Sequence, residues 1–414
     1  MPPVIVIMLD GVSADHLATH AARVPHLAAL AAVGFQVDRV RPDLPATSLP
    51  GRTSILTGVA ADLHGVYGNF IWDGERFRYA NPDDVRVPTL PRLGLDAGLD
   101  VAVLGYGMVR PEDATVFHHA WWANEMLQRA RDAEPIPADE GWLRTSRHRD
   151  GTGRLAALAA AGLPDGVPDA YAGDRTHYFL SELAGDQTML QWTAALACGE
   201  APPDLLFTEV LTPDTVMHLA GHESPFSHWA ITFADGLVGN LLAALERAGR
   251  RDSTTIVVTS DHGHGPVARA LYARELLSDR AVATEGAVLY VAVDGERDAA
   301  SVAARLAAVG VIRLADDAHL PDDRRGDLAT FVAPPGAAFE HRPAEVPAGT
   351  TSGPARYRSS HGFAPGTASD DRFLIVTGPG VRPHRRARAD SADVAATVAA
   401  LAGIELATAG TPLI

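Results

Sequence analysis

Short runs of consecutive apolar residues recur along the chain and are separated by segments with helical periodicity. The run Val4–Leu9 is continuous and rich in β-branched residues, which is typical of a strand buried on both faces of a parallel sheet. Four later runs have the same character: Val101–Leu104, Leu205–Val210, Thr254–Thr259 and Phe373–Thr377. This alternation predicts an α/β fold with a mostly parallel central sheet and helices on both of its faces.

Helical patterns lie between and after these strands. Pro25–Val33 has an apolar face and is followed by Gly34, a residue that commonly ends a helix. We also expect helices at Gly51–Leu56, Phe226–Ala248 and Asp393–Ala402.

Two segments fit the sheet less well. Arg110–Gly185 is rich in Asp, Gly, Pro and Trp, and we expect helices and loops over one sheet edge. Ala287–Leu320 has the pattern strand, helix, strand, which predicts a small inserted cap of βαβ type. We therefore expect one main domain formed by residues 1–285 and 357–414, with residues 286–356 inserted as an α+β cap.

Composition and charge narrow the classes of function. Hydrophobic residues make up 47% of the 414 residues, which favours a globular protein with a substantial core. The formal net charge of −16 argues against binding to a nucleic-acid duplex. The chain contains no lysine, so a lysine Schiff base and a P-loop lysine are excluded. Cys198 is the single cysteine, which excludes an internal disulfide and a thiolate zinc site.

No targeting or membrane segment is apparent in the sequence. No stretch of about 20 apolar residues is free of charges or helix breakers. The first apolar run is short and lacks a basic segment before it, unlike a secretory signal. We therefore expect a cytoplasmic protein without a membrane partner, and the sequence does not indicate its oligomeric state.

Acidic and histidine side chains gather at the predicted ends of strands. An isolated Asp-Gly or Asp-His pair is most often part of a turn, but here four separate segments carry such residues at the same expected edge of the sheet. Mixed carboxylate and imidazole ligation suits Zn²⁺, with Mn²⁺ or Fe as alternatives, and six ligands are enough for two ions. The six candidate ligands are Asp10, Asp214, His218, Asp261, His262 and His361.

A candidate nucleophile lies at Thr47–Ser48, just before Pro50-Gly51 and a predicted helix. The N–H groups at a helix N-terminus would stabilise an anionic phosphoryl group next to this hydroxyl. The hydroxyl itself would need a metal to activate it as a nucleophile. The alternative is that Thr47 or Ser48 only caps the helix.

In this order, the motifs resemble those of the alkaline phosphatase superfamily, and within it the type I phosphodiesterases/nucleotide pyrophosphatases. The resemblance covers most of the chain. The matching segments are Asp10-Gly11 after the first strand, VPHLAALAAVGF, SLPGRTSILTG, ADLHGVYGN, TPDTVMH, TSDHGH, SSHGF and the closing SADVAATVAALAGIELATAGTPL.

This resemblance implies a two-metal hydrolase of small phosphate esters or nucleotides. One ion would be held by Asp214, His218 and His361, and the other by Asp10, Asp261 and His262. The family position of the nucleophile falls on Ser48 and not on Thr47. Ser48 would also contact the second ion, and would attack phosphorus to form a phosphoseryl intermediate that water then hydrolyses.

Three features depart from the family pattern or extend it. Arg52 follows Pro50-Gly51 where the family usually has Asn after the Pro, so we expect Arg52 either to bind a substrate oxygen or to lie on the helix surface. Asn69 would also contact substrate, and its aromatic neighbours could either stack on a leaving group or simply pack in a turn. His264 either touches substrate or stands beside the metals without a role. The aromatic neighbours are Tyr67, Phe70 and Trp72.

Several other functions stay open at this stage. A phosphonate hydrolase of the phosphonoacetate type or a phosphomonoesterase would share these ligands. The Ser-x-Pro-Gly-Arg motif is similar to the sulfatase signature, but the ligand set fits two zinc ions better than one calcium. A non-catalytic binding protein is disfavoured because all six ligand positions are filled, and a metal-dependent phosphomutase would need more ligands.

Overall fold

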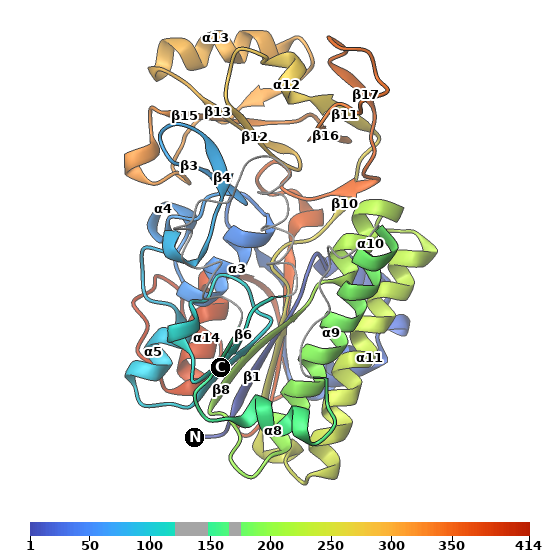
Figure 1. Ribbon diagram of the computed structural model, residues 1–414, viewed down its shortest axis with the longest axis vertical. Helices are drawn as coiled ribbons and strands as arrows, with labels where there is room; N and C mark the ends of the chain where they lie inside the picture. The colour runs from blue at the N-terminus through green and yellow to red at the C-terminus, as the bar shows by residue number, and fades with distance from the viewer. Residues whose placement is uncertain (121–147, 165–174) are drawn as a thin grey trace.

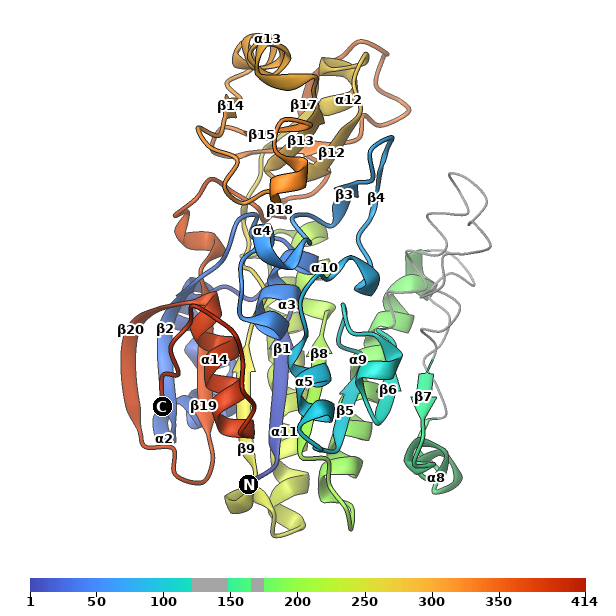
Figure 2. The same ribbon diagram turned by 90° about the vertical axis from the view of Figure 1, so that its left-hand side faces the viewer.

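The computed structural model describes residues 1–120, 148–164 and 175–414, and in this part of the chain nine strands form the central sheet. The strands run side by side in Figure 2, below a separate upper part. Their order across the sheet is β20 (His384–Asp390), β2 (Phe35–Arg41), β19 (Arg372–Thr377), β9 (Thr255–Thr259), β1 (Val4–Leu9), β8 (Leu205–Val210), β5 (Val101–Leu104), β6 (Val116–His118) and β7 (His148–Asp150).

The sheet is mostly parallel, as its alternation of strands and helices predicts. Strands β9, β1, β8, β5 and β6 are parallel neighbours, and β2 is parallel to β20. Strand β19 runs antiparallel to both β9 and β2, and β7 antiparallel to β6. All five strands predicted from apolar runs are present, with bounds that agree to within one residue.

The continuous apolar sequence of β1 follows from its central position. Val4, Val6 and Met8 face one hydrophobic core, while Ile5 and Ile7 face the other. Because successive side chains of a strand point to opposite faces, a strand covered on both sides has no position for a polar residue until it ends.

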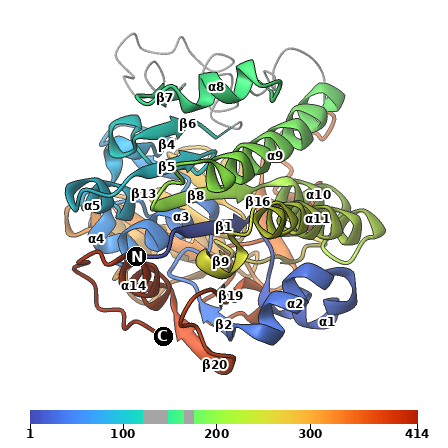
Figure 3. The same cartoon turned by 90° about the horizontal axis from the view of Figure 1, so that it is seen from below.

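Helices cover both faces of the sheet (Figures 1 and 3). On one face lie α2 (Pro25–Val33), α9 (Arg175–Cys198), α10 (Thr212–Ala220) and α11 (Pro225–Arg247). On the other lie α3 (Ser48–Thr57), α5 (Leu90–Asp96) and α14 (Ser391–Ala402). Helix α3 begins three residues earlier than expected, at Ser48 and not at Gly51. Pro50 is tolerated there because the first turn of a helix has no internal partner for its N–H groups.

The upper part in Figure 1 contains two small sheets with a core of their own. One has the order β16 (Ala337–Glu340), β11 (Arg269–Tyr272) and β17 (Ser352–Pro354), and the other β12 (Val282–Glu285), β13 (Val288–Ala292), β15 (Leu328–Val332) and β14 (Ile312–Arg313). Helices α12 (Ala273–Leu276) and α13 (Gly295–Ala307) complete this part, which we call the cap.

The strand–helix–strand pattern predicted in the cap corresponds to β13, α13 and β14. These two strands do not pair with each other, because β15 lies between them and is antiparallel to both. The predicted insertion, residues 286–356, overlaps most of the cap, whose first strand, β11, begins earlier, at Arg269.

Much of the segment predicted to lie over one sheet edge, Arg110–Gly185, is outside the described residues. Its described portion contains β6 and β7 at the sheet edge, α8 (Arg154–Ala160) and the first part of α9. Among the described residues, no helix combines the length and the apolar character needed to cross a membrane.

Candidate metal centre and active site

The carboxyl ends of the central parallel strands bring the predicted ligands together beneath the cap. Asp10 directly follows β1, and Asp261 follows β9 after one intervening serine. Helix α10 begins two residues after β8 and carries Asp214 and His218 one turn apart. His361 directly follows the short strand β18 (Ser359–Ser360).

The first group of ligands is compact. The ligand atoms of Asp10, Asp261 and His262 lie within 4.8 Å of one another, and all three side chains are buried. The Nε2 atom of His262 is 3.3 Å from Asp10 Oδ1 and 3.7 Å from Asp261 Oδ2. The structure thus brings together the three residues that the resemblance assigns to one ion.

The remaining ligands fall into two groups that share Asp214. One consists of Asp214, His218 and His264, and the other of Asp214, His262 and His361. The set that the resemblance assigns to the other ion is therefore divided between these groups. His264, for which the sequence left a bystander role open, has its Nε2 2.7 Å from Asp214 Oδ1.

The cluster fits divalent cations by the chemistry of its donors. The Nδ1 atoms of His218 and His262 lie 3.0 Å from the carbonyl oxygens of Ser359 and Gly263. A carbonyl only accepts, so each Nδ1 carries the proton and each Nε2 keeps a lone pair for a metal. The buried Asp10 Oδ1 has no hydrogen-bond partner, and such an oxygen is available to bind a cation.

The protonation states of Asp214 and His361 agree with this fit, whereas burial raises the pKa of Asp10 well above its ordinary value. Burial, followed by the charges of His262 and His218, lowers the pKa of His361 well below its ordinary value. Burial opposes ionisation of Asp214, but the nearby His218 and the hydrogen bond with His264 outweigh it and hold the pKa of this carboxyl well below its usual range. A neutral imidazole and an ionised carboxylate are the forms that bind metals.

Arg52 takes a place that the sequence did not predict. Its side chain is only 1% exposed, and its guanidinium contacts three buried carboxylates, those of Asp10, Glu209 and Asp261. Nε is 2.9 Å from Glu209 Oε2, and Nη1 is 2.8 Å from Asp261 Oδ2. Burial disfavours the charged guanidinium, but these carboxylates outweigh it and raise the pKa of Arg52 further above its already high value.

The expectation that Arg52 lies on the helix surface is therefore corrected, because its guanidinium is buried against the carboxylates of Asp10, Glu209 and Asp261. Contact between Arg52 and a substrate oxygen stays a prediction. Glu209, its third partner, was missed by the sequence reasoning. The available signal was a single charged residue inside the otherwise uncharged strand LLFTEV.

Gly51 allows helix α3 to lie against the end of β9. A Cβ atom at this position would be 2.4 Å from the carbonyl oxygen of Asp261, closer than any real contact. The glycine in Pro50-Gly51-Arg52 is thus explained by close backbone approach, which in turn lets Arg52 reach the carboxylates.

The structure places Ser48, and not Thr47, against the ligand cluster. Ser48 is the first residue of α3, and its Oγ is 3.1 Å from His262 Nε2. Thr47 precedes the helix in an extended conformation, is fully buried, and its hydroxyl makes no hydrogen bond. The capping alternative is not what the geometry shows, because neither hydroxyl accepts from the first turn of α3.

Asn69 lies beside Ser48 and is held in place from the cap. Its Oδ1 accepts a hydrogen bond of 2.8 Å from the backbone N–H of Leu49. Glu285, on β12, accepts from the backbone N–H groups of Asn69 at 2.9 Å and Phe70 at 2.7 Å. Burial raises the pKa of Glu285 to about 8. Because Oδ1 is occupied, the side-chain NH₂ of Asn69 is the group left to meet a ligand.

The aromatic residues near Asn69 differ in burial. Tyr67 is buried, and its hydroxyl accepts a hydrogen bond from the backbone of Trp72 at 2.7 Å, so it belongs to the packed turn. Phe70 and Trp72 are only partly buried and form β3 (Phe70–Trp72), which pairs with β4 (Phe77–Tyr79).

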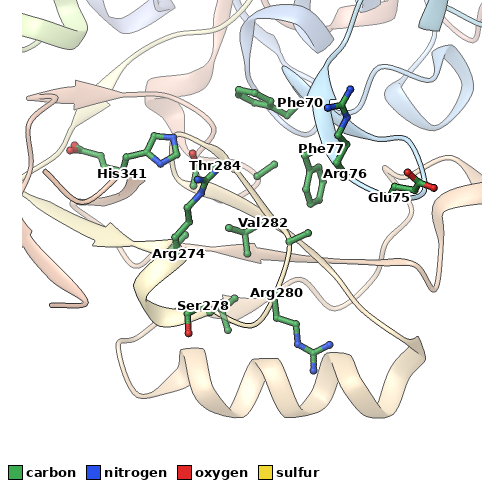
Figure 4. A pocket seen from close by; sticks show the side chains of 15 residues that line it. Phe70, Glu75, Arg76, Phe77, Arg274, Ser278, Arg280, Val282, Thr284 and His341 are labelled. Carbon is green, nitrogen blue, oxygen red and sulfur yellow. The ribbon is translucent and has the colours of Figure 1, made fainter. Parts of the chain in front are cut away.

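A cavity of about 410 Å³ separates this hairpin from the cap. Phe70 and Phe77 line it from the hairpin, and Arg274, Thr284 and His341 line it from the cap (Figure 4). Phe70, which lines the cavity, is the residue after Asn69, while neither Asn69 nor Ser48 lines it.

Comparison with known proteins gives one family. The family model described as type I phosphodiesterase/nucleotide pyrophosphatase matches residues 4–354. An uncharacterized pyrophosphatase/phosphodiesterase of Schizosaccharomyces pombe is 25% identical over 300 residues, which are 71% of this chain and 52% of that protein. Ectonucleotide pyrophosphatase/phosphodiesterase family member 3 of Bos taurus is 33% identical over 73 residues, 18% of this chain and 8% of that protein.

Solved structures with the same fold are also found. Murine ectonucleotide pyrophosphatase/phosphodiesterase 5, solved as an inactive variant in complex with AMP, superimposes with a TM-score of 0.70 at 16% identity, covering 99% of this chain and 98% of that one. The human protein of the same name gives a TM-score of 0.70 at 14% identity, covering 99% and 97%. The chain thus spans only part of the curated relatives it matches in sequence, while the fold agrees over nearly its whole length.

Proposed function

Since the chain belongs to the type I phosphodiesterase/nucleotide pyrophosphatase family, a family of phosphoric ester hydrolases, we propose that it hydrolyses phosphodiester or pyrophosphate bonds of small molecules, nucleotides among them. The observation that carries this proposal is the position of Ser48. Its hydroxyl lies 3.1 Å from a ligand of a buried carboxylate–histidine cluster, at the N-terminus of a helix.

We assign one metal position to Asp10, Asp261 and His262, and the other to Asp214 with His218 and His361. Divalent ions, zinc by the chemistry of these donors with manganese or iron as alternatives, would lower the pKa of a hydroxyl and neutralise charge on the phosphoryl oxygens. His264 supports this second position through its contact with Asp214. Arg52 holds the outer oxygens of Asp10 and Asp261 and balances part of the negative charge.

Ser48 is the proposed nucleophile. Its Oγ forms a bond to phosphorus while the bond from phosphorus to the leaving oxygen breaks, which gives a phosphoseryl intermediate. Water then attacks the same phosphorus and releases Ser48. The N–H of Leu49 already donates to Asn69 and Pro50 has none, so the positive end of α3 would favour the anionic phosphoryl group mainly through its dipole. The NH₂ of Asn69 would donate to one of the phosphoryl oxygens.

The cavity between the hairpin and the cap is the proposed subsite for the leaving group or the rest of the substrate. Phe70 and Phe77 offer aromatic surface, and Arg274 offers a cation to it. Such a lining suits a flat ring with attached polar groups. AMP in the murine relative is a ligand of that kind.

The test is a panel of nitrophenyl esters assayed with defined metals: a phosphodiester, a phosphomonoester, a phosphonate and a sulfate. We expect the diester to be turned over best. Preference for the phosphonate or monoester would replace the proposed reaction by one of those, and turnover of the sulfate alone would exclude phosphoryl transfer.

Two variants test the nucleophile. Ser48→Ala should abolish turnover of the diester while the protein keeps its metals, whereas the matched control Thr47→Val should retain near-normal activity because it removes only a buried, unpaired hydroxyl. Metal content and initial rates measure both. Near-normal activity of Ser48→Ala, with activity lost in Thr47→Val, would mean that the nucleophile is Thr47.

A further inference from the structure

A second group of side chains that could hold a metal ion shares no residue with the ligands described above, and we call it the flank site. Helix α1 (Ala14–Thr19) carries His16, and His20 follows at the end of this helix. His228 comes from the first turn of α11, and Glu223 from the connection between α10 and α11. Figure 3 shows α1 on the same side of the sheet as α10 and α11.

The three imidazoles have the spacing of ligands to one ion. Their ligand atoms lie within 4.8 Å of one another. The ring centroid of His20 is 4.6 Å from that of His16 and 4.3 Å from that of His228. Two nitrogens bound to the same tetrahedral zinc at about 2.0–2.1 Å are themselves about 3.3 Å apart, so small side-chain rotations would close the site.

A carboxylate completes the set. Glu223 Oε2 is 2.9 Å from His20 Nε2 and 3.3 Å from His228 Nε2. One oxygen atom therefore already faces two of the three imidazoles from a single position. Three histidines and one carboxylate are a complete tetrahedral donor set for Zn²⁺.

His16 points independently to a ligand. Its relative exposure is only 3%, and its Nε2 has no hydrogen-bond partner. A buried polar nitrogen without a partner is costly unless something binds it.

We propose that His16, His20, His228 and Glu223 form a structural binding site for a divalent transition-metal ion, zinc by preference. Its donors close all four tetrahedral positions, which is the arrangement of a structural site, whereas a catalytic site keeps one position open. The ion would tie α1 to the start of α11 and to the connection that follows α10. Because α10 carries Asp214 and His218, the bound ion would stabilise the position of this helix and of both side chains. The ion itself would take no part in the reaction.

The decisive experiment counts metal ions. Wild-type protein and the double variant His20→Gln/His228→Gln are equilibrated with buffered Zn²⁺, desalted, and analysed for zinc per chain by mass spectrometry. We expect the variant to hold about one ion fewer, with kcat/KM for the diester substrate at saturating zinc largely retained. His384→Gln, which changes an exposed histidine on β20, is the matched control and should keep the full count.

Two further readouts keep the test decisive. Zinc should raise the melting temperature of wild-type protein more than that of the double variant, while the two should melt alike in chelator. Glu223→Gln, which changes a side chain that is 55% exposed and leaves the packed core untouched, should weaken zinc binding at this site about 10–100-fold. Equal zinc content in wild type and double variant would overturn the proposal and leave a hydrogen-bonded histidine cluster. So would loss of the same ion from the His384→Gln control.

Discussion

Replacing Arg52 by methionine is expected to destabilise the metal-free protein severely. Arg52 is the shared cation of Asp10, Glu209 and Asp261, all of which are at most 3% exposed. Removing one partner from a buried ion pair typically costs about 3–5 kcal/mol, because the remaining charge is left uncompensated. Here one removal affects three carboxylates, so we expect Arg52→Met to lose at least about 3–5 kcal/mol of unfolding free energy in chelator.

Metal ions should rescue part of this loss. Asp10 and Asp261 are also assigned as ligands of one ion, so saturating zinc would compensate two of the three carboxylates. The loss of the guanidinium would then remain only at Glu209, which still accepts from the Gly107 N–H. Urea denaturation of wild type, Arg52→Met and Arg52→Lys, each with chelator and with zinc, measures the effect. Arg52→Lys should be intermediate, since it keeps the charge but not the planar three-way geometry.

The opposite pattern would refute the reasoning. If Arg52→Met unfolds within about 0.5 kcal/mol of wild type in chelator, as an ordinary surface change would, the buried ion-pair network is not what the side chain contributes. A raised KM for the diester with unchanged stability and metal affinity would return Arg52 to the role of a substrate-binding residue.

Two further predictions concern backbone approach and pH. Gly51→Ala should lower stability by about 1–3 kcal/mol and weaken metal binding, since its Cβ would meet the carbonyl oxygen of Asp261 at 2.4 Å. Gly236→Ala on α11, with nothing within 4 Å of the new Cβ, should be neutral or stabilising; equal effects of both in urea denaturation would contradict the proposed approach. For Glu285, a pKa raised from 4.5 to about 8 means that the folded state binds the proton more tightly. Its contribution is therefore full below pH 4.5 and lost as the pH rises through about 8. Relative to Glu285→Gln, wild-type stability should fall across this window by up to about 1.4 kcal/mol per pH unit, and parallel pH profiles would disprove this.

Much of the fold and the ligand types follows from local sequence. The short run Val4–Leu9, rich in β-branched residues, favours a strand covered on both faces, and the structure has such a strand there. The spacing of Asp214 and His218 places both on one face of any helix, and α10 is such a helix. The sequence pattern left both Thr47 and Ser48 as candidate nucleophiles, and the family resemblance favoured Ser48. In the structure, the Ser48 hydroxyl lies 3.1 Å from His262 Nε2.

Only the tertiary structure determined which residues distant in sequence contact one another. Arg52 and Glu209 are 157 positions apart, and Asn69 and Glu285 are 216 apart, so no local pattern links them. The antiparallel insertion of β19 between β9 and β2 is likewise a matter of long-range pairing. The histidines of the flank site also come from helices far apart in the chain.

The physical reason is the range over which each kind of information acts. Periodicity and residue chemistry act within a few neighbours, and they determined the buried strands, the helix faces and the donor types. The pairing of charges buried in one core depends on how those elements pack. Arg52 illustrates the difference: its sequence context suggested that it binds substrate, whereas the tertiary structure buries its guanidinium among the carboxylates of Asp10, Glu209 and Asp261.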